Sequence, residues 1–279
     1  MLTRIITSIC AICVLVPVLC FSQTALLPIG IAIVSLIATY EMAKCMGYQK
    51  NFALTIPVCA FATVSPFLLR YLKDFEQYVK IAFIVASLYL LYTFFLIIRS
   101  HGKLQFQNAL AFFAVSCYII AALNAILYIH DNESNGRFLY LLIFLGAWIT
   151  DIFAYFTGVF FGKHKLIEDV SPKKTVEGSL GGIFFCALFY VVYGLILSHF
   201  FAVEVNLIML GVSGLILSVV SQIGDLIMSV IKRHYAIKDF GKIFPGHGGV
   251  LDRFDSILAV SLGLAAIAAF GELVALPLM

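Results

Sequence analysis

The sequence predicts an all-α, polytopic membrane protein. Of its 279 residues, 62% are hydrophobic and only 12% are charged, and the mean hydropathy is +1.05. A soluble domain is typically about half apolar and a quarter charged. Apolar runs long enough to cross a bilayer, roughly 20 residues each, follow one another along the chain. This composition excludes an ordinary soluble domain, and the net charge of +3 is too small to indicate a nucleic-acid partner.

We expect nine spanning helices in a single integral membrane domain, 1–279. The first apolar run, after Arg4, lacks a convincing signal-peptide cleavage motif, so we predict that it is retained. Residues 22–24 are predicted to form a tight turn after it. Residues 1–137 are predicted to be mainly scaffold, and residues 138–279 to carry the catalytic spans and loops. The predicted spans are 5–21, 25–40, 53–69, 81–98, 109–129, 138–161, 180–201, 206–227 and 256–274.

The distribution of Lys and Arg predicts the orientation. With nine spans and a cytoplasmic N-terminus, fourteen of the eighteen basic residues fall on the cytoplasmic side. Before residue 163 the two sides carry nearly equal numbers, so the prediction depends on the C-terminal third. It places the polar stretches 163–178 and 229–255 together at the cytoplasmic face.

The stretch 229–255 concentrates the chemistry of the chain. Its cations suit phosphate groups, and its carboxylates, which offer only oxygen, suit Mg²⁺. Four residues, Pro245, Gly246, Gly248 and Gly249, make a backbone that no regular helix tolerates and that a ligand can approach closely. The sequence therefore predicts a phosphate-plus-metal site at a membrane surface. The cations are Lys232, Arg233, Lys238, Lys242 and Arg253, and the carboxylates are Asp239, Asp252 and Asp255.

This stretch closely resembles the signature of the phosphatidate cytidylyltransferases (CDP-diacylglycerol synthases). A pattern with this many fixed positions is far more specific than a lone glycine-rich loop. Recognisable motifs cover about residues 146–260, while the first 130 or so residues share only hydrophobic character with the family. The matching positions are Ser229, Lys232, Arg233, Lys238, Asp239, Gly241, Phe244, Pro245, His247, Gly248, Gly249, Asp252, Arg253, Phe254 and Asp255.

The second polar stretch, 163–178, contains Ser-Pro-Lys-Lys-Thr-Val-Glu-Gly from Ser171 onward. Its paired lysines suit triphosphate oxygens, and Glu177 suits sugar hydroxyls or a lysine partner. The alternative is a positive-inside loop that touches lipid headgroups. The family carries a similar element, which favours substrate binding by Ser171, Lys173, Lys174, Thr175 and Glu177.

Two acidic residues lie within predicted spans. Asp151 near a bilayer centre would cost about 2.5–3.5 kcal/mol, so we expect it to face a wet polar site, with a buried structural pair as the alternative. Asp225 shares a helix face with Ser221 and Ser229 and needs a cation or metal there. The resemblance implies that Asp151 faces the site and that Asp225 is a metal ligand.

Three further carboxylates lie at predicted helix ends. Asp252 and Asp255, one turn apart near the start of the ninth span, make a plausible Mg²⁺ seat, with helix capping as the alternative. Glu41 follows the second span, where the helix dipole does not stabilise a carboxylate, and Lys44 is its candidate partner.

The resemblance implies a transfer of the cytidylyl group of CTP to phosphatidic acid, which gives CDP-diacylglycerol and pyrophosphate. It implies Mg²⁺, as two divalent ions or as one divalent and one monovalent ion. It also implies a homodimer among membrane lipids, in the bacterial inner membrane. The implied catalytic residues are Asp225, Asp252, Asp255, Lys232 and Arg233; the metal ligands are Asp225, Asp252, Asp255 and Asp151; Ser229, Lys238, Asp239, His247, Gly248, Gly249 and Arg253 would bind substrate.

Several alternatives stay open. His247 is equally suited to hold its turn, and Arg253 to pair with an aspartate. A related enzyme would use CTP with a polyprenyl or ether-lipid phosphate. A cation-coupled transporter would use Asp151 and Asp225 as its ion site, but the charges gather at one membrane face and the sequence has no internal repeat. The longer aspartate-rich motif of a CDP-alcohol phosphotransferase is missing from the sequence.

Overall fold

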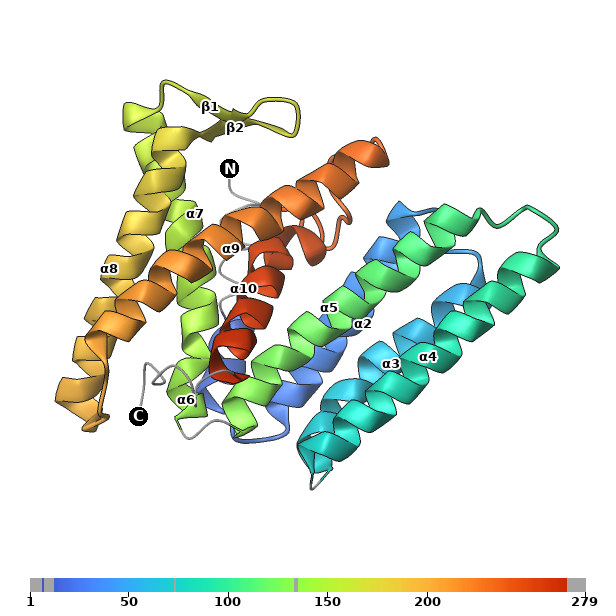
Figure 1. The fold of residues 1–279 in the computed structure, drawn as a ribbon, viewed down its shortest axis with the longest axis horizontal. Helices are drawn as coiled ribbons and strands as arrows, with labels where there is room; N and C mark the ends of the chain where they lie inside the picture. The colour runs from blue at the N-terminus through green and yellow to red at the C-terminus, as the bar shows by residue number, and fades with distance from the viewer. Residues whose placement is uncertain (1–6, 8–12, 73, 133–134, 270–279) are drawn as a thin grey trace. The chain divides into compact units, whose positions relative to one another are not determined.

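The structure, a computed structural model, describes residues 7, 13–72, 74–132 and 135–269 (Figure 1). All long elements in this part of the chain are helices. The helices, including the short α6, are α2 (Leu26–Cys45), α3 (Phe52–Tyr71), α4 (Phe75–Arg99), α5 (Phe106–Asn132), α6 (Gly136–Leu139), α7 (Leu141–Phe161), α8 (Val176–Phe201), α9 (Leu207–His234) and α10 (Leu251–Ala269). The predicted first span, 5–21, lies partly outside the described residues, and its residues 13–20 are helical.

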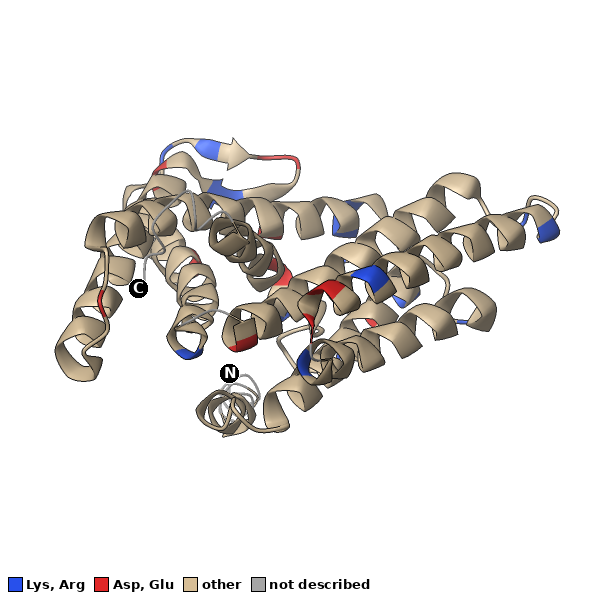
Figure 2. Cartoon of the chain, turned by 60° about the horizontal axis from the view of Figure 1, so that its bottom comes forward, with Lys and Arg blue, Asp and Glu red and all other residues tan. Residues whose placement is uncertain are grey.

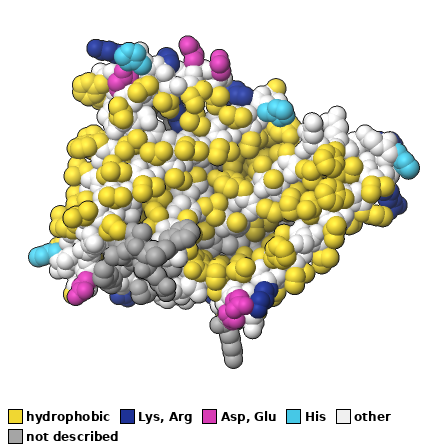
Figure 3. Space-filling view, in the orientation of Figure 1, with side chains coloured by type: hydrophobic (Ala, Val, Ile, Leu, Met, Phe, Trp, Pro, Cys, Tyr) yellow, Lys and Arg dark blue, Asp and Glu magenta, His cyan; other side chains and the backbone are white. Residues whose placement is uncertain are grey.

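Seven helical segments of the described chain are long and apolar enough to cross a membrane: 26–45, 52–71, 75–99, 106–132, 136–161, 176–201 and 207–234. They coincide with the second to eighth predicted spans, so the chain is an integral, multi-pass membrane protein. Hydrophobic side chains cover the flanks of the helices in Figure 3. The helix α10 carries Asp252, Arg253 and Asp255 near its start and is not among the seven, so the ninth span stays a prediction.

The helices extend beyond the apolar runs that predicted them. A hydrophobic run marks only the stretch that suits lipid, whereas backbone hydrogen bonding continues into the polar flanks. Thus α9 continues to His234 and includes Ser229, Lys232 and Arg233.

The all-α fold class is supported, with one short β-hairpin between helices. Strands β1 (Lys165–Ile167) and β2 (Ser171–Thr175) form an antiparallel hairpin, with Lys165 opposite Thr175 and Ile167 opposite Ser171. Pro172 cannot donate a backbone hydrogen bond, so a two-stranded edge tolerates it where a helix interior would not. No strand is predicted for this segment from the sequence.

The chain forms two compact units. The first comprises residues 1–127 and 235–253, and the second comprises 128–234 and 254–279. The first boundary lies near the predicted division at residue 137. The segment 235–253 carries much of the family signature, yet it belongs to the same unit as the N-terminal helices. The prediction that residues 1–137 are mainly scaffold stays a prediction.

In the first unit, polar side chains connect helices within the apolar interior. The hydroxyl of Tyr89 on α4 donates to the carbonyl of Leu54 on α3 (2.8 Å), and the Asn124 amide on α5 donates to Ser65 Oγ on α3 (2.9 Å). Because water cannot satisfy such groups in a membrane, each pair contributes to a specific packing.

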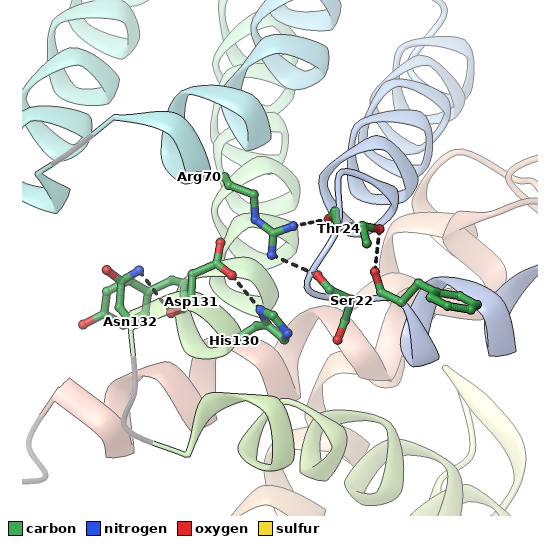
Figure 4. A network of polar contacts seen from close by, with 8 residues as sticks. Ser22, Thr24, Arg70, His130, Asp131 and Asn132 are labelled. Atoms are coloured by element: carbon green, nitrogen blue, oxygen red, sulfur yellow. Dashed lines mark hydrogen bonds and ion pairs between the residues drawn. The ribbon is translucent and has the colours of Figure 1, made fainter.

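The predicted turn at residues 22–24 is confirmed (Figure 4). The Thr24 N–H donates to the Phe21 carbonyl at 2.9 Å. The Arg70 guanidinium, from the end of α3, donates to the carbonyls of Ser22 (3.1 Å) and Thr24. In the second unit, His130 Nδ1 lies 2.6 Å from Asp131 Oδ1. Figure 4 also draws this contact.

In the second unit, glycines allow α7 and α8 to pack closely. A Cβ at Gly178 would lie 2.6 Å from the Ala154 carbonyl oxygen, and one at Gly182 would lie 2.9 Å from that of Thr150. Thr150 also donates to Ser218 Oγ on α9 at 2.8 Å. These glycines therefore allow the backbones of α7 and α8 to approach closely.

We expect Gly182→Val to destabilise this interface. The new side chain would press on the backbone of α7, and overpacking typically costs about 1–3 kcal/mol. Thermal unfolding in detergent should show a lower midpoint than for the wild type. Leu180→Val, at a position 62% exposed on the same helix, serves as the control and should leave the midpoint nearly unchanged. Equal midpoints for the two variants would contradict this packing.

Candidate active site

Three carboxylates of the second unit converge from three helices: Asp151 on α7, Asp225 on α9 and Asp255 on α10. Removal from water, and then repulsion from Asp225 and Asp151, raise the pKa of Asp255 to about 7, although Lys232 acts in the opposite direction. Ser256 Oγ donates to Asp151 Oδ2 (3.1 Å), and the Ser256 N–H donates to Asp255 Oδ1 (2.9 Å). These carboxylates concentrate negative charge at one place.

Basic residues from the hairpin and α9 surround this charge. Lys174 on β2 forms an ion pair with Asp225, and both side chains are 24% exposed. The Arg233 guanidinium donates to the Val170 carbonyl in the hairpin turn (3.4 Å). The hairpin and the last turns of α9 therefore lie side by side. The sequence predicts that the polar stretches 163–178 and 229–255 lie together, and this contact joins the parts of both stretches that belong to the second unit. Figure 2 shows acidic and basic positions together on the hairpin.

The hairpin is anchored at the start of α8. Thr175 Oγ1 caps the helix by accepting from the Gly178 N–H at 3.1 Å. Glu177 accepts from the backbone N–H groups of Lys163 (3.1 Å) and His164 (3.2 Å) and contacts the His164 ring at 2.6 Å. The predicted substrate residues Thr175 and Glu177 thus have structural contacts, while Lys173 is exposed and available to a ligand.

In the first unit, residues 235–250 form a loop with a tight turn. The Phe244 carbonyl accepts from the N–H groups of His247 (2.9 Å) and Gly248 (3.1 Å). Gly248 has a φ of +90°, a left-handed conformation that favours glycine. Arg253 Nε donates to the His247 carbonyl at 3.0 Å, so Arg253 holds the turn from the start of α10.

Asp252 has a structural role that differs from the capping alternative, because its partners lie in the loop before α10. It is 7% exposed, and its Oδ2 accepts from the N–H groups of Phe240 (2.8 Å) and Gly249 (2.9 Å). A carboxylate that accepts such bonds fixes the loop against the helix start. Its predicted part in a metal site stays a prediction.

Sequence reasoning missed Glu41. Its carboxyl group accepts from the N–H groups of Val250 (3.1 Å) and Leu251 (2.9 Å). The position of Glu41 at the end of an apolar run was visible in the sequence, but its partners lie about 210 residues away. Pairing Glu41 with Lys44 did not anticipate this contact.

The predicted residues therefore fall into two sets. The second unit holds Asp151, Asp225, Asp255, Lys232, Arg233, Ser229 and the hairpin residues Ser171, Lys173 and Lys174. The first unit holds Lys238, Asp239, His247, Gly248, Gly249, Asp252 and Arg253. Lys238 and Asp239 are exposed, and His247 is half-buried.

Comparison with known proteins gives the family. The model of the cytidylyltransferase family matches residues 2–270. This chain belongs to the cytidylyltransferase family. It is 32% identical over 260 residues to a phosphatidate cytidylyltransferase of Staphylococcus haemolyticus (strain JCSC1435), and 34% identical over 261 residues to one of Staphylococcus aureus (strain COL). Each alignment covers 93% of this chain and 96% of the relative. The predicted family is confirmed.

The family assignment raises the question of whether the carboxylates of the site suit a divalent cation. Oxygen-only donors suit Mg²⁺. Burial, and then repulsion from Asp225, raises the pKa of Asp255, so a cation beside this carboxylate would be stabilising. Among the described residues, however, no group of three or more His, Cys, Asp or Glu side chains is already arranged to hold a metal ion. The donor chemistry suits Mg²⁺, while the metal site at Asp151, Asp225, Asp252 and Asp255 stays a prediction.

We expect the Lys174–Asp225 pair to be energetically coupled. Both side chains are largely removed from water, so the single variants Lys174→Met and Asp225→Asn should not add in the double variant. A coupling of about 0.5–3 kcal/mol in thermal or chemical unfolding is the range for residues in contact.

The exposed pair Glu76–Lys80 on α4 is the matched control, with side chains 71% and 66% exposed. Exposed pairs typically contribute about 0.2–1 kcal/mol. A coupling for Lys174–Asp225 no larger than for the control pair would contradict the assignment of a partly buried ion pair.

Proposed function

We propose that this protein transfers the cytidylyl group of CTP to phosphatidic acid, which yields CDP-diacylglycerol and pyrophosphate. The observation that carries the proposal is the alignment with relatives named phosphatidate cytidylyltransferase along nearly the whole chain. Cations and carboxylates gathered at the end of α9 support the same reaction, since every reacting group in it is a phosphate.

The proposed reaction needs positioning more than proton transfer. A phosphate oxygen of phosphatidic acid forms a bond to the α-phosphorus of CTP. The bond from that phosphorus to the oxygen bridging the β-phosphate breaks, and pyrophosphate leaves with the electron pair. Because the attacking oxygen is already anionic, no protein base is required. Catalysis then depends on alignment and on neutralising charge.

The basic residues of the second unit would supply much of that neutralisation. Lys174, Lys173, Lys232 and Arg233 would bind phosphate oxygens. Since Lys174 contacts Asp225, a phosphate bound to this lysine would lie beside the carboxylate cluster. Bound Mg²⁺ would neutralise negative charge on the phosphate oxygens. Asp151, Asp225 and Asp255 would hold it, as one or two divalent ions or as one divalent with one monovalent ion.

The setting of the reaction is also part of the proposal. We place the protein in the bacterial inner membrane, as a homodimer with its N-terminus in the cytoplasm. The clustering of Lys and Arg in the hairpin and around residues 232–253 supports a cytoplasmic site. CTP would reach the site from water, and the acyl chains of phosphatidic acid would remain among the membrane lipids.

The direct test is pyrophosphate release by purified protein in detergent. Each nucleoside triphosphate is supplied with Mg²⁺ and with either phosphatidic acid or a polyprenyl phosphate. Release should require both CTP and phosphatidic acid. Asp225→Asn should lower the rate by roughly 10²–10³-fold, the range for loss of one preorganised electrostatic group. Glu204→Gln, at an exposed residue, is the control and should retain the wild-type rate.

Other outcomes would change the assignment. Release only with the polyprenyl acceptor would indicate a related CTP-dependent enzyme with another lipid substrate. Absence of turnover with every acceptor, together with ion flux across proteoliposomes, would replace the enzyme with the transporter alternative. Wild-type activity in Asp225→Asn would remove the carboxylate cluster from the mechanism.

A further inference from the structure

Glu41 is the one acidic residue in the first 73 positions of the sequence, and it is only 3% exposed. A carboxyl group removed from water needs donors that replace its hydration. Glu41 Oε1 accepts from the Val250 N–H (3.1 Å) and Oε2 from the Leu251 N–H (2.9 Å). Both donors lie at the start of α10, where free N–H groups and the helix dipole favour an acidic partner.

Glu41 and Asp252 together accept hydrogen bonds from three consecutive backbone N–H groups. Asp252 Oδ2 accepts from Gly249, and Glu41 accepts from Val250 and Leu251. The Asp252 carboxylate also accepts from Phe240, on the other side of the loop. A residue of α2 therefore helps to fix the short backbone segment that carries much of the family signature.

Two glycines of the signature leave room for Glu41. A Cβ at Gly241 would lie 2.0 Å from Glu41 Oε1, and one at Gly249 would lie 2.3 Å from the same atom. Neither glycine has a positive φ, so close approach, rather than backbone conformation, is the physical reason for glycine at both positions. The loop is shaped around this carboxyl group.

We propose that Glu41 is a positioning residue for the cytidylyl transfer. By holding the backbone from Gly249 to Leu251, it sets where Asp252 and Arg253 stand at the start of α10. The effect on the reaction rests on the proposed function, while the effect on the backbone does not. The tests below keep these two parts separate.

The first test follows the backbone without any substrate. Hydrogen–deuterium exchange is measured on peptides covering residues 240–256 in the wild type, Glu41→Gln and Glu41→Ala. Losing charge-assisted acceptors should speed exchange in this segment by roughly tenfold or more. Glu76→Gln, the same change at an exposed carboxylate, is the control and should exchange like the wild type. Wild-type protection in both Glu41 variants would overturn the proposal.

The second test is a double-mutant cycle between Glu41 and Gly241, which lie too close together for a Cβ at position 241. Gly241→Ala should lower activity and protection in the wild-type background, because its Cβ meets the Glu41 carboxyl group. In Glu41→Ala that group is gone, so adding Gly241→Ala should have little further effect. Fully additive effects would contradict the inference that Glu41 is the reason for glycine at this position.

The third test separates positioning from folding. Loss of folded protein lowers the rate but leaves the KM for CTP unchanged. A displaced Arg253, which the family resemblance assigns to substrate binding, should raise that KM in Glu41→Gln by roughly tenfold, the low end for a hydrogen bond to a charged group. An unchanged KM and an unchanged rate per folded molecule would overturn the positioning role. If Glu41→Ala fails to fold, Glu41→Gln keeps the side-chain size and supplies the exchange and KM results.

Failure of the proposed function would look different. A wild-type protein inactive with CTP and phosphatidic acid would refute the reaction, and exchange would still decide whether Glu41 holds this backbone. An active wild type with unaltered Glu41 variants would refute the positioning role alone.

Discussion

Acidic groups in this apolar chain must find donors or cations, and the functional region is organised by that requirement. In the first unit, the carboxyl groups of Glu41 and Asp252 accept from backbone N–H groups at the start of α10. In the second unit, Asp225 pairs with Lys174 and Asp151 accepts from Ser256. An unpaired carboxylate in such surroundings would be strongly destabilising, so each of these contacts limits where its helix can lie.

The two kinds of partner have different consequences. Backbone N–H groups are fixed in the chain and cannot be exchanged for other partners, so Glu41 and Asp252 are suited to hold a loop in place. A lysine side chain can move, so the Asp225–Lys174 pair is suited to a site that exchanges one cation for another when phosphates arrive.

Much of this arrangement could be predicted from the sequence. Apolar runs located the seven described helical segments that are long and apolar enough to cross a membrane, because lipid demands long uninterrupted stretches. The fixed spacing from Ser229 to Asp255 identified the family. The hairpin at 165–175 was missed because the prediction used only helix length and helix breakers. Glu41 was missed for another reason: a contact over some 210 residues has no local pattern in one sequence. The joint role of Asp252 and Asp255 as a metal seat stays a prediction.

The proposed cation site at Asp151, Asp225 and Asp255 is the part of the mechanism that one measurement can test most directly. Electron paramagnetic resonance of Mn²⁺, used as a probe for Mg²⁺, tests it without turnover by measuring the free ion as protein is added. The account predicts saturable binding by the wild type and by Glu204→Gln, with binding weakened at least roughly tenfold in Asp225→Asn. Equal Mn²⁺ affinity in the wild type and Asp225→Asn would contradict it.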